Sequence, residues 1–229
     1  MSSALSDAVT IPDAEHWAAS QVVLWGVEQY GHDIAIASSF GAEDVVLIDL
    51  AAKLAPGIRV FTLDTDFLFP ETYELIETIE RRYGISVERT RSKLTPEQQA
   101  GAHGEALWKS DPDLCCRLRK VEPLTDMLTG LSAWITGIRR DQAPTRANAQ
   151  KIEWDVRFGL MKLNPIAEWK WDELWTYIRA NDVPYNPLHD RNYPSIGCTH
   201  CTRPVAAGED PRAGRWSGTG KVECGLHVK

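Results

Sequence analysis

Strand-like stretches alternate with helix-like stretches over the first two-thirds of the chain, and this alternation constrains the fold more than any other feature. A repeated strand, helix, strand order predicts a parallel sheet with helices on its faces. The expected strands are 33–40, 58–65, 85–91 and 131–138, and the expected helices are 14–30, 42–55, 70–83, 114–129 and 169–182. We therefore expect an α/β fold with a mostly parallel sheet.

The composition bounds the class of protein. The 229 residues are 43% hydrophobic and 25% charged, which is typical of a globular chain with a sizeable core. The net charge of −7 argues against a general nucleic-acid-binding protein, although a local cluster of Arg and Lys could still hold a small anion. Because the sequence shows neither a membrane-length apolar run nor a secretory signal, we expect a cytoplasmic protein.

A change in composition divides the chain into two parts. Residues 1–207 contain the expected strands and helices and are predicted to form one α/β domain. Residues 208–229 are rich in Gly, Arg and charge, and are predicted to form a flexible C-terminal segment. The sequence does not determine the oligomeric state and leaves a homo-oligomer open.

Four of the five cysteines form two pairs, Cys115-Cys116 and Cys198-Cys201. A disulfide between adjacent cysteines would close a small strained ring, so a structural crosslink is disfavoured. Four thiolates are the ligand set of tetrahedral zinc or of an iron–sulfur cluster, and free buried thiols are a third interpretation. The spacing favours a cluster over zinc. Lys120 lies one helical turn after Cys116 and is expected to project toward the same site.

The fifth cysteine, Cys224, lies close to the end of the chain. Basic residues share its segment, and positive charge lowers the pKa of a thiol and so favours the reactive thiolate. These residues are His227, Lys221, Arg212 and Arg215. Cys224 is therefore a candidate nucleophile, and the alternative is an exposed thiol without a role.

The loop after the first expected strand has the character of an anion site. Ser38 and Ser39 supply hydroxyl donors, and Gly41 allows close approach of the backbone at a helix N-terminus, where anions are favoured. An ordinary strand-to-helix turn is the alternative interpretation of this short motif.

Two further loops end at the same carboxyl edge, where open α/β sheets bind ligands. The second strand runs into "LDTD" (63–66), and the fourth runs into "GIRRDQAPTR" (137–146). Arg139, Arg140 and Arg146 of the latter would suit a phosphate or sulfate, with a solvated basic loop as the alternative.

Taken together, these motifs resemble the assimilatory sulfonucleotide reductases, and among them the bacterial and plant-type adenylylsulfate (APS) reductases. The resemblance runs from about residue 33 to 228. It is carried by "SSFGAEDVVL", "LDTDFLFPETY", "DLCCRLRKVEPL", "GIRRDQAPTR", "NPLHDRNYPSIGCTHCTRPV" and "ECGLH". The combination of both cysteine pairs with "ECGLH" is highly specific, whereas either loop motif alone would not be.

The resemblance implies an adenine-nucleotide α-hydrolase-like fold, related to the PP-loop ATP pyrophosphatases. It also implies a [4Fe–4S] cluster on Cys115, Cys116, Cys198 and Cys201. The implied reaction is reduction of APS to sulfite and AMP through an S-sulfocysteine on Cys224, with thioredoxin or a glutaredoxin as the thiol donor. Reductases of the 3′-phosphorylated substrate (PAPS) typically lack the four cluster cysteines, so APS is expected, with PAPS or dual use as the alternative.

The resemblance also assigns individual site residues. The implied catalytic residues are Cys224, His227 and Lys120. The implied substrate-binding residues are Ser38, Ser39, Gly41, Leu63, Asp64, Thr65, Gly137, Arg146, Arg212 and Arg215. Two positions depart from the family pattern: Asp66 stands where glycine is usual, and Phe40 where some members have serine, and both bear on the contacts with adenosine and ribose.

Two other functional classes were weighed. A PP-loop pyrophosphatase or thiolase acting on RNA would typically show Ser-Gly-Gly-x-Asp-Ser, whereas this chain has "SFGAED" at 39–44 and an acidic net charge. A non-enzymatic redox sensor built on the same fold would release no sulfite.

Overall fold

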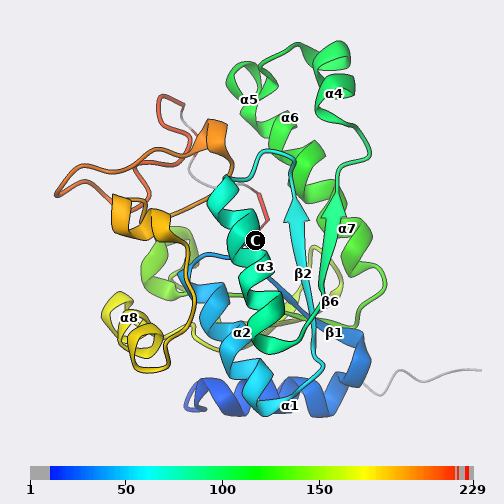
Figure 1. Ribbon diagram of the computed structural model, residues 1–229. Coiled ribbons are helices and arrows are strands. Elements are labelled where there is room, and N and C mark those ends of the chain that lie inside the picture. The colour runs from blue at the N-terminus through cyan, green and yellow to red at the C-terminus, as the bar shows by residue number, and fades with distance from the viewer. Residues whose placement is uncertain (1–10, 220, 222–224, 227–229) are drawn as a thin grey trace, which may run out of the picture.

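The computed structural model describes residues 11–219, 221 and 225–226, and its ribbon is drawn in Figure 1. Six strands form one sheet in the order β3-β2-β1-β4-β6-β5. Their bounds are β1 Ile34–Ala37, β2 Arg59–Asp64, β3 Val87–Arg91, β4 Ala133–Ile135, β5 Ile152–Asp155 and β6 Leu160–Leu163. All neighbouring strands pair in parallel except β5, which is antiparallel to β6. The predicted α/β fold with a mostly parallel sheet is confirmed.

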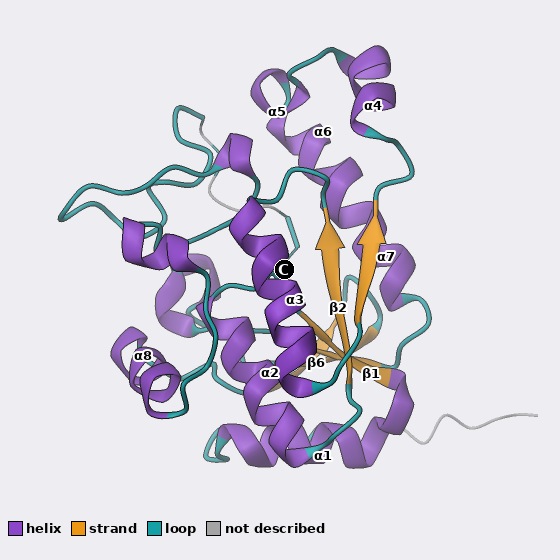
Figure 2. Cartoon of the chain, viewed as in Figure 1, coloured by secondary structure: helices purple, strands orange, loops and turns teal. Residues whose placement is uncertain are grey.

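Helices cover both faces of the sheet (Figures 1 and 2). Their bounds are α1 Ala19–Tyr30, α2 Ala42–Leu54, α3 Pro70–Tyr83, α4 Pro96–His103, α5 Leu107–Ser110, α6 Pro112–Cys116, α7 Glu122–Leu128 and α8 Trp171–Ala180. No helix among the described residues is long and apolar enough to cross a membrane.

The alternation of side chains along β1 divides the core in two. Ile34 and Ile36 face a large apolar cluster built with α1, α2, α3 and α8. Ala35, between them, faces a smaller cluster that includes Leu124 and Leu128 of α7. Because both faces of the sheet are covered, the central strand is continuously apolar, as expected for a buried parallel strand.

The helix expected over 114–129 is interrupted. α6 and α7 are joined by a π-helical turn, Arg117–Val121, so the helical path continues with a local widening. Pro123 lies in the first turn of α7 and has no N–H to donate to the preceding turn, which removes a regular helical hydrogen bond where the π turn lies. This turn carries Arg119 and Lys120 just after the cysteine pair.

The order of the strands determines where a ligand can bind. From β1 the chain proceeds to β2 and β3 on one side, and β4 then pairs with β1 on the other side. The loops after β1 and β4 consequently diverge at the carboxyl edge of the sheet. Such a switch point is where open α/β sheets form a ligand crevice.

Candidate functional site

A cavity of about 440 Å³ opens at this switch point. It is lined by the loops that follow β1, β2 and β4 and by part of the C-terminal segment. Among the predicted substrate-binding residues it is lined by Ser38, Ser39, Gly41, Leu63, Thr65, Gly137, Arg146, Arg212 and Arg215. Residues far apart in the sequence are therefore brought together at the edge where the motifs predicted a ligand.

Asp64 is the predicted substrate-binding residue whose side chain is used elsewhere. Its carboxylate is fully buried and accepts hydrogen bonds from Tyr73 Oη (2.7 Å) and from Arg91 Nη2 (2.7 Å). Burial opposes ionisation of Asp64, but these hydrogen bonds outweigh it and hold the pKa of the carboxyl below its usual value. Asp64 thus orders the loop after β2, while its neighbours Leu63 and Thr65 face the cavity.

The side chain of Asp44 holds the loop after β1 in place through hydrogen bonds. Its carboxylate accepts hydrogen bonds from Ser39 N (2.5 Å) and Ser39 Oγ (2.8 Å). Burial raises the pKa of Asp44 to about 6, although the bonds from Ser39 oppose the shift. Phe40 has a positive φ of 58° and its ring is buried in the core, so this departure from the family pattern supports the loop from inside the fold.

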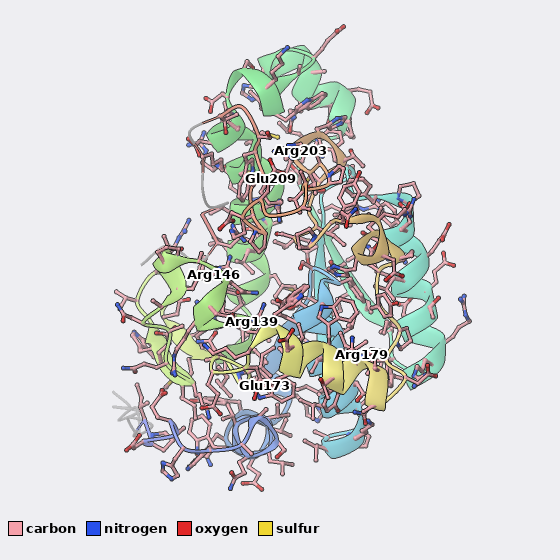
Figure 3. All side chains as sticks on the ribbon, turned by 90° about the vertical axis from the view of Figure 1, so that its left-hand side faces the viewer. Arg139, Arg146, Glu173, Arg179, Arg203 and Glu209 are labelled. Atoms are coloured by element: carbon pink, nitrogen blue, oxygen red, sulfur yellow. The ribbon has the colours of Figure 1, made fainter. Side chains whose placement is uncertain are left out.

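The arginines after β4 have different partners. Arg139 pairs with Glu43 (2.9 Å) and Asp141, and Arg140 pairs with Glu15, so the predicted cluster of three anion-binding arginines is not formed as expected. Arg139 and Arg146 both line the cavity, and Figure 3 labels both side chains. The carboxylates that pair with Arg139 already offset its charge.

In the C-terminal segment, a buried tryptophan packs against an arginine that lines the cavity. Trp216 is 4% exposed, has a φ of 47°, and donates its backbone N–H to Cys201 O (3.0 Å). The guanidinium of Arg215 lies 4.6 Å from the Trp216 ring and donates to Ser195 Oγ and Ile196 O, each at 3.1 Å. The described part of the predicted flexible segment is therefore anchored here, while its flexibility stays a prediction.

The four paired cysteines line one small second cavity. Cys115 and Cys116 end α6, and Cys198 and Cys201 flank a short 3-10 turn. Thr65 Oγ1 lies 3.3 Å from Cys198 Sγ, which ties this cavity to the loop after β2. The remaining walls are mainly aromatic: Phe67, Trp108, His200 and Trp216.

Two thiols of this cavity, Cys115 and Cys201, would be neutral on their own. Burial, together with the neighbouring cysteines, raises the pKa of Cys115 to about 12 and that of Cys201 to about 11. Arg119 opposes the shift at Cys115, and Lys120 opposes it at Cys201. Within the described residues, no group of three or more His, Cys, Asp or Glu side chains has the arrangement of a site for one metal ion.

Lys120 and Trp216 line both cavities, so the cysteine pocket and the larger cavity share a wall. Lys120 lies beside the four cysteines, as its spacing from Cys116 led us to expect, and it also reaches the larger cavity. Trp216 was not predicted from the sequence, and Arg119 follows the cysteine pair but is not among the predicted site residues. The sequence signal for Arg119 was its position close after the cysteine pair. Nothing in the Gly- and Arg-rich C-terminal segment indicated a role for Trp216.

Cys224 and His227 lie outside the described residues. Leu226, close to both in sequence, lines the larger cavity and packs on the apolar cluster under the sheet edge. Lys221 donates from Nζ to Pro112 O (3.4 Å), at the start of α6. Of these two described residues, Leu226 therefore lines the larger cavity itself, and Lys221 contacts Pro112, which lines the cysteine pocket.

Comparisons with known proteins agree with this geometry. The sequence profile of the phosphoadenosine phosphosulfate reductase domain matches residues 33–204. The adenosine 5′-phosphosulfate reductase of Halalkalibacterium halodurans is 52% identical over 207 residues, which is 90% of each chain. Adenosine 5′-phosphosulfate reductase 2 of Bacillus subtilis is 49% identical, covering 90% of this chain and 88% of its own.

Solved structures extend the comparison to the fold. A phosphate complex of the phosphoadenylyl-sulfate (PAPS) reductase from Candida auris superposes with a TM-score of 0.74 at 32% identity, covering 82% of this chain and 91% of its own. The FMN adenylyltransferase of Candida glabrata, in complex with ATP, superposes with a TM-score of 0.60 at 17% identity, covering 82% and 61%. The second likeness concerns the fold alone.

Proposed function

Because the chain belongs to the phosphoadenosine phosphosulfate reductase family, we propose that it is an adenylylsulfate reductase, which reduces APS to sulfite and AMP in sulfate assimilation. Relatives of that name are about half identical to it over most of the chain. The observation that carries the proposal is the wall that Lys120 forms between a four-cysteine pocket and a cation-lined cavity.

We propose that the four cysteines hold a [4Fe–4S] cluster, and the residues around them suit one. Arg119 Nη2 and Trp216 Nε1 are buried donors for which the described part of the chain supplies no acceptor. Sulfide and thiolate sulfur would accept from both. When bound, the cluster would supply fixed negative charge beside Lys120, which in turn reaches the substrate cavity.

The first chemical step is proposed to occur on Cys224. Its thiolate attacks the sulfur of APS, the bond between sulfur and the bridging oxygen breaks, and AMP leaves, so that an S-sulfocysteine forms. Anionic oxygens on the sulfate repel a thiolate, and cations are needed to offset that charge. Lys120, Arg146, Arg212 and Arg215 are proposed to do this, and His227 to assist at the nucleophile.

Release of sulfite is proposed to require thioredoxin or a glutaredoxin. A thiolate of the donor attacks the Cys224 sulfur, sulfite leaves, and the mixed disulfide is resolved by the second thiol of the donor. Both electrons then come from thiols. A cytoplasmic location, where thiols stay reduced, fits this requirement.

An anaerobic assay with APS and PAPS in parallel tests the function. With thioredoxin as donor, we expect sulfite from APS and much less from PAPS. Equal rates would indicate a dual reductase, and no sulfite from either substrate would contradict the proposal. Iron and acid-labile sulfide analysis, with the visible absorption band, separates a cluster from zinc.

The role of Cys224 has its own test. Cys224→Ser should keep its iron and bind AMP, yet form no S-sulfonated enzyme on mixing with APS. Cys201→Ser is the contrasting variant, since it should lose iron. Mass spectrometry that finds the sulfonate adduct on a cysteine other than Cys224 would refute the assignment.

A further inference from the structure

The loop after β2 carries a feature that the reaction does not require. Asp66 has a positive φ of 60°, a conformation that glycine adopts freely and other residues seldom do. Aspartate tolerates it better than most side chains, but still at a conformational cost. A side chain kept in such a position is expected to make a contact that compensates for the strain.

The contact is an ion pair with a buried arginine. Asp66 Oδ2 lies 2.7 Å from Nη1 of Arg119, whose side chain is 1% exposed. Nε of the same guanidinium donates to Gln99 Oε1 (2.7 Å), and the Phe67 ring lies 5.0 Å from it. Asp66 is thus the carboxylate that neutralises Arg119 in the described structure, since Gln99 and Phe67 carry no charge.

The same loop touches both cysteine pairs. Arg119 follows Cys116 by three residues on the π-helical turn and is close enough to Cys115 to affect its pKa. On the other side, Phe67 O accepts from Thr199 N (2.8 Å), next to Cys198. The ion pair therefore joins the segment that carries one cysteine pair to the loop that contacts the other.

We propose that Asp66 is a positioning residue which keeps Arg119 buried and oriented before the cluster is in place. The proposal rests on the cluster-binding function above. A buried cation without a counter-ion is strongly destabilising. Among the described residues, Asp66 is the carboxylate in ion-pair contact with Arg119, whereas a bound cluster would offer a second anion to the unpartnered Nη2 of Arg119. Asp66 should therefore contribute more to the stability of the iron-free protein than to that of the iron-loaded protein.

Unfolding midpoints of Asp66→Asn, measured anaerobically in iron-free and iron-loaded protein, test this difference. Asparagine keeps the size of the side chain and its tolerance of positive φ, but removes the charge. We expect the midpoint to fall by roughly 6 °C without iron and by less than half as much with iron. Asp66→Gly, which also relieves the strained backbone, should show the same difference between the two states.

Glu88→Gln is the matched control, since Glu88 of β3 forms an ion pair with Arg59 of β2 and neither residue lines the cysteine pocket. Its effect should be equal with and without iron. Equal shifts for Asp66→Asn in both states would overturn the role of Asp66 while leaving the cluster in place. A wild-type chain that takes up no iron–sulfur cluster would overturn the proposed cofactor itself, and this proposal with it.

Discussion

Gly137→Ala is predicted to disturb the substrate cavity through backbone packing. A Cβ at Gly137 would lie 2.3 Å from Asp44 Oδ1 and 2.8 Å from Glu43 Cβ. Non-bonded heavy atoms prefer separations of about 3.5 Å, so the end of β4 and the start of α2 have to separate by roughly 1 Å. Overpacking of this kind is expected to lower the free energy of unfolding by about 1–3 kcal/mol.

The displacement also affects the loop after β1, because the backbone N–H and the hydroxyl of Ser39 both donate to the Asp44 carboxylate. If one substrate hydrogen bond is lost, at about 1 kcal/mol, the affinity for nucleotide falls on the order of 5- to 10-fold. Calorimetric titration with AMP measures this directly. Gly130→Ala is the control, since an added Cβ there meets nothing within 4 Å. AMP affinity and stability equal to those of the control would refute the packing argument.

Three further variants address other parts of the site. Lys120→Ala should lower kcat for APS by at least about 10-fold with unchanged iron content, because it removes a cation from the shared wall; unchanged turnover would contradict the link. Gly214→Ala places a Cβ 2.2 Å from Arg203 O and should reduce turnover more than AMP affinity, since it separates the C-terminal segment from the domain. Asp44 has a folded pKa of about 6 against an ordinary 3.8, so its contribution to stability is lost as the pH rises through that range. The wild type should therefore lose on the order of 3 kcal/mol relative to Asp44→Asn between pH 4 and 7, as measured by urea unfolding.

The sequence predicted the helices and strands well where local signals and tertiary packing agree. The expected helix 70–83 is α3, whose first residue is Pro70, and the expected strand 58–65 contains β2. β5 and β6 were not anticipated. They form an antiparallel hairpin at the sheet edge, and their alternation is obscured because Glu153 and Lys162 are buried together rather than facing solvent. Two buried charges in paired strands make each strand look like a polar loop.

The site shows the same limit. Motifs identified the residues whose chemistry depends on their type, such as the four paired cysteines and Lys120, and these do come together. They could not show that the carboxylate of Asp64 is used to order its own loop, or that Arg139 is neutralised by Glu43. Both facts depend on partners far apart in the chain, which only the fold brings into contact.

The contacts of the C-terminal segment limit the positions at which it can detach from the domain. In the proposed reaction, Cys224 meets the substrate in the cavity and afterwards presents its sulfur to a second protein. Trp216 is buried and its backbone N–H donates to Cys201 O, in the domain. The backbone N–H of Lys221 donates instead to Thr219 Oγ1 (3.2 Å), within the segment itself. We therefore expect the segment to release after Trp216 and to remain docked before it. Hydrogen exchange should then protect the amide of Trp216 far more than that of Lys221, with and without AMP; equal, rapid exchange at both would place the hinge earlier in the chain.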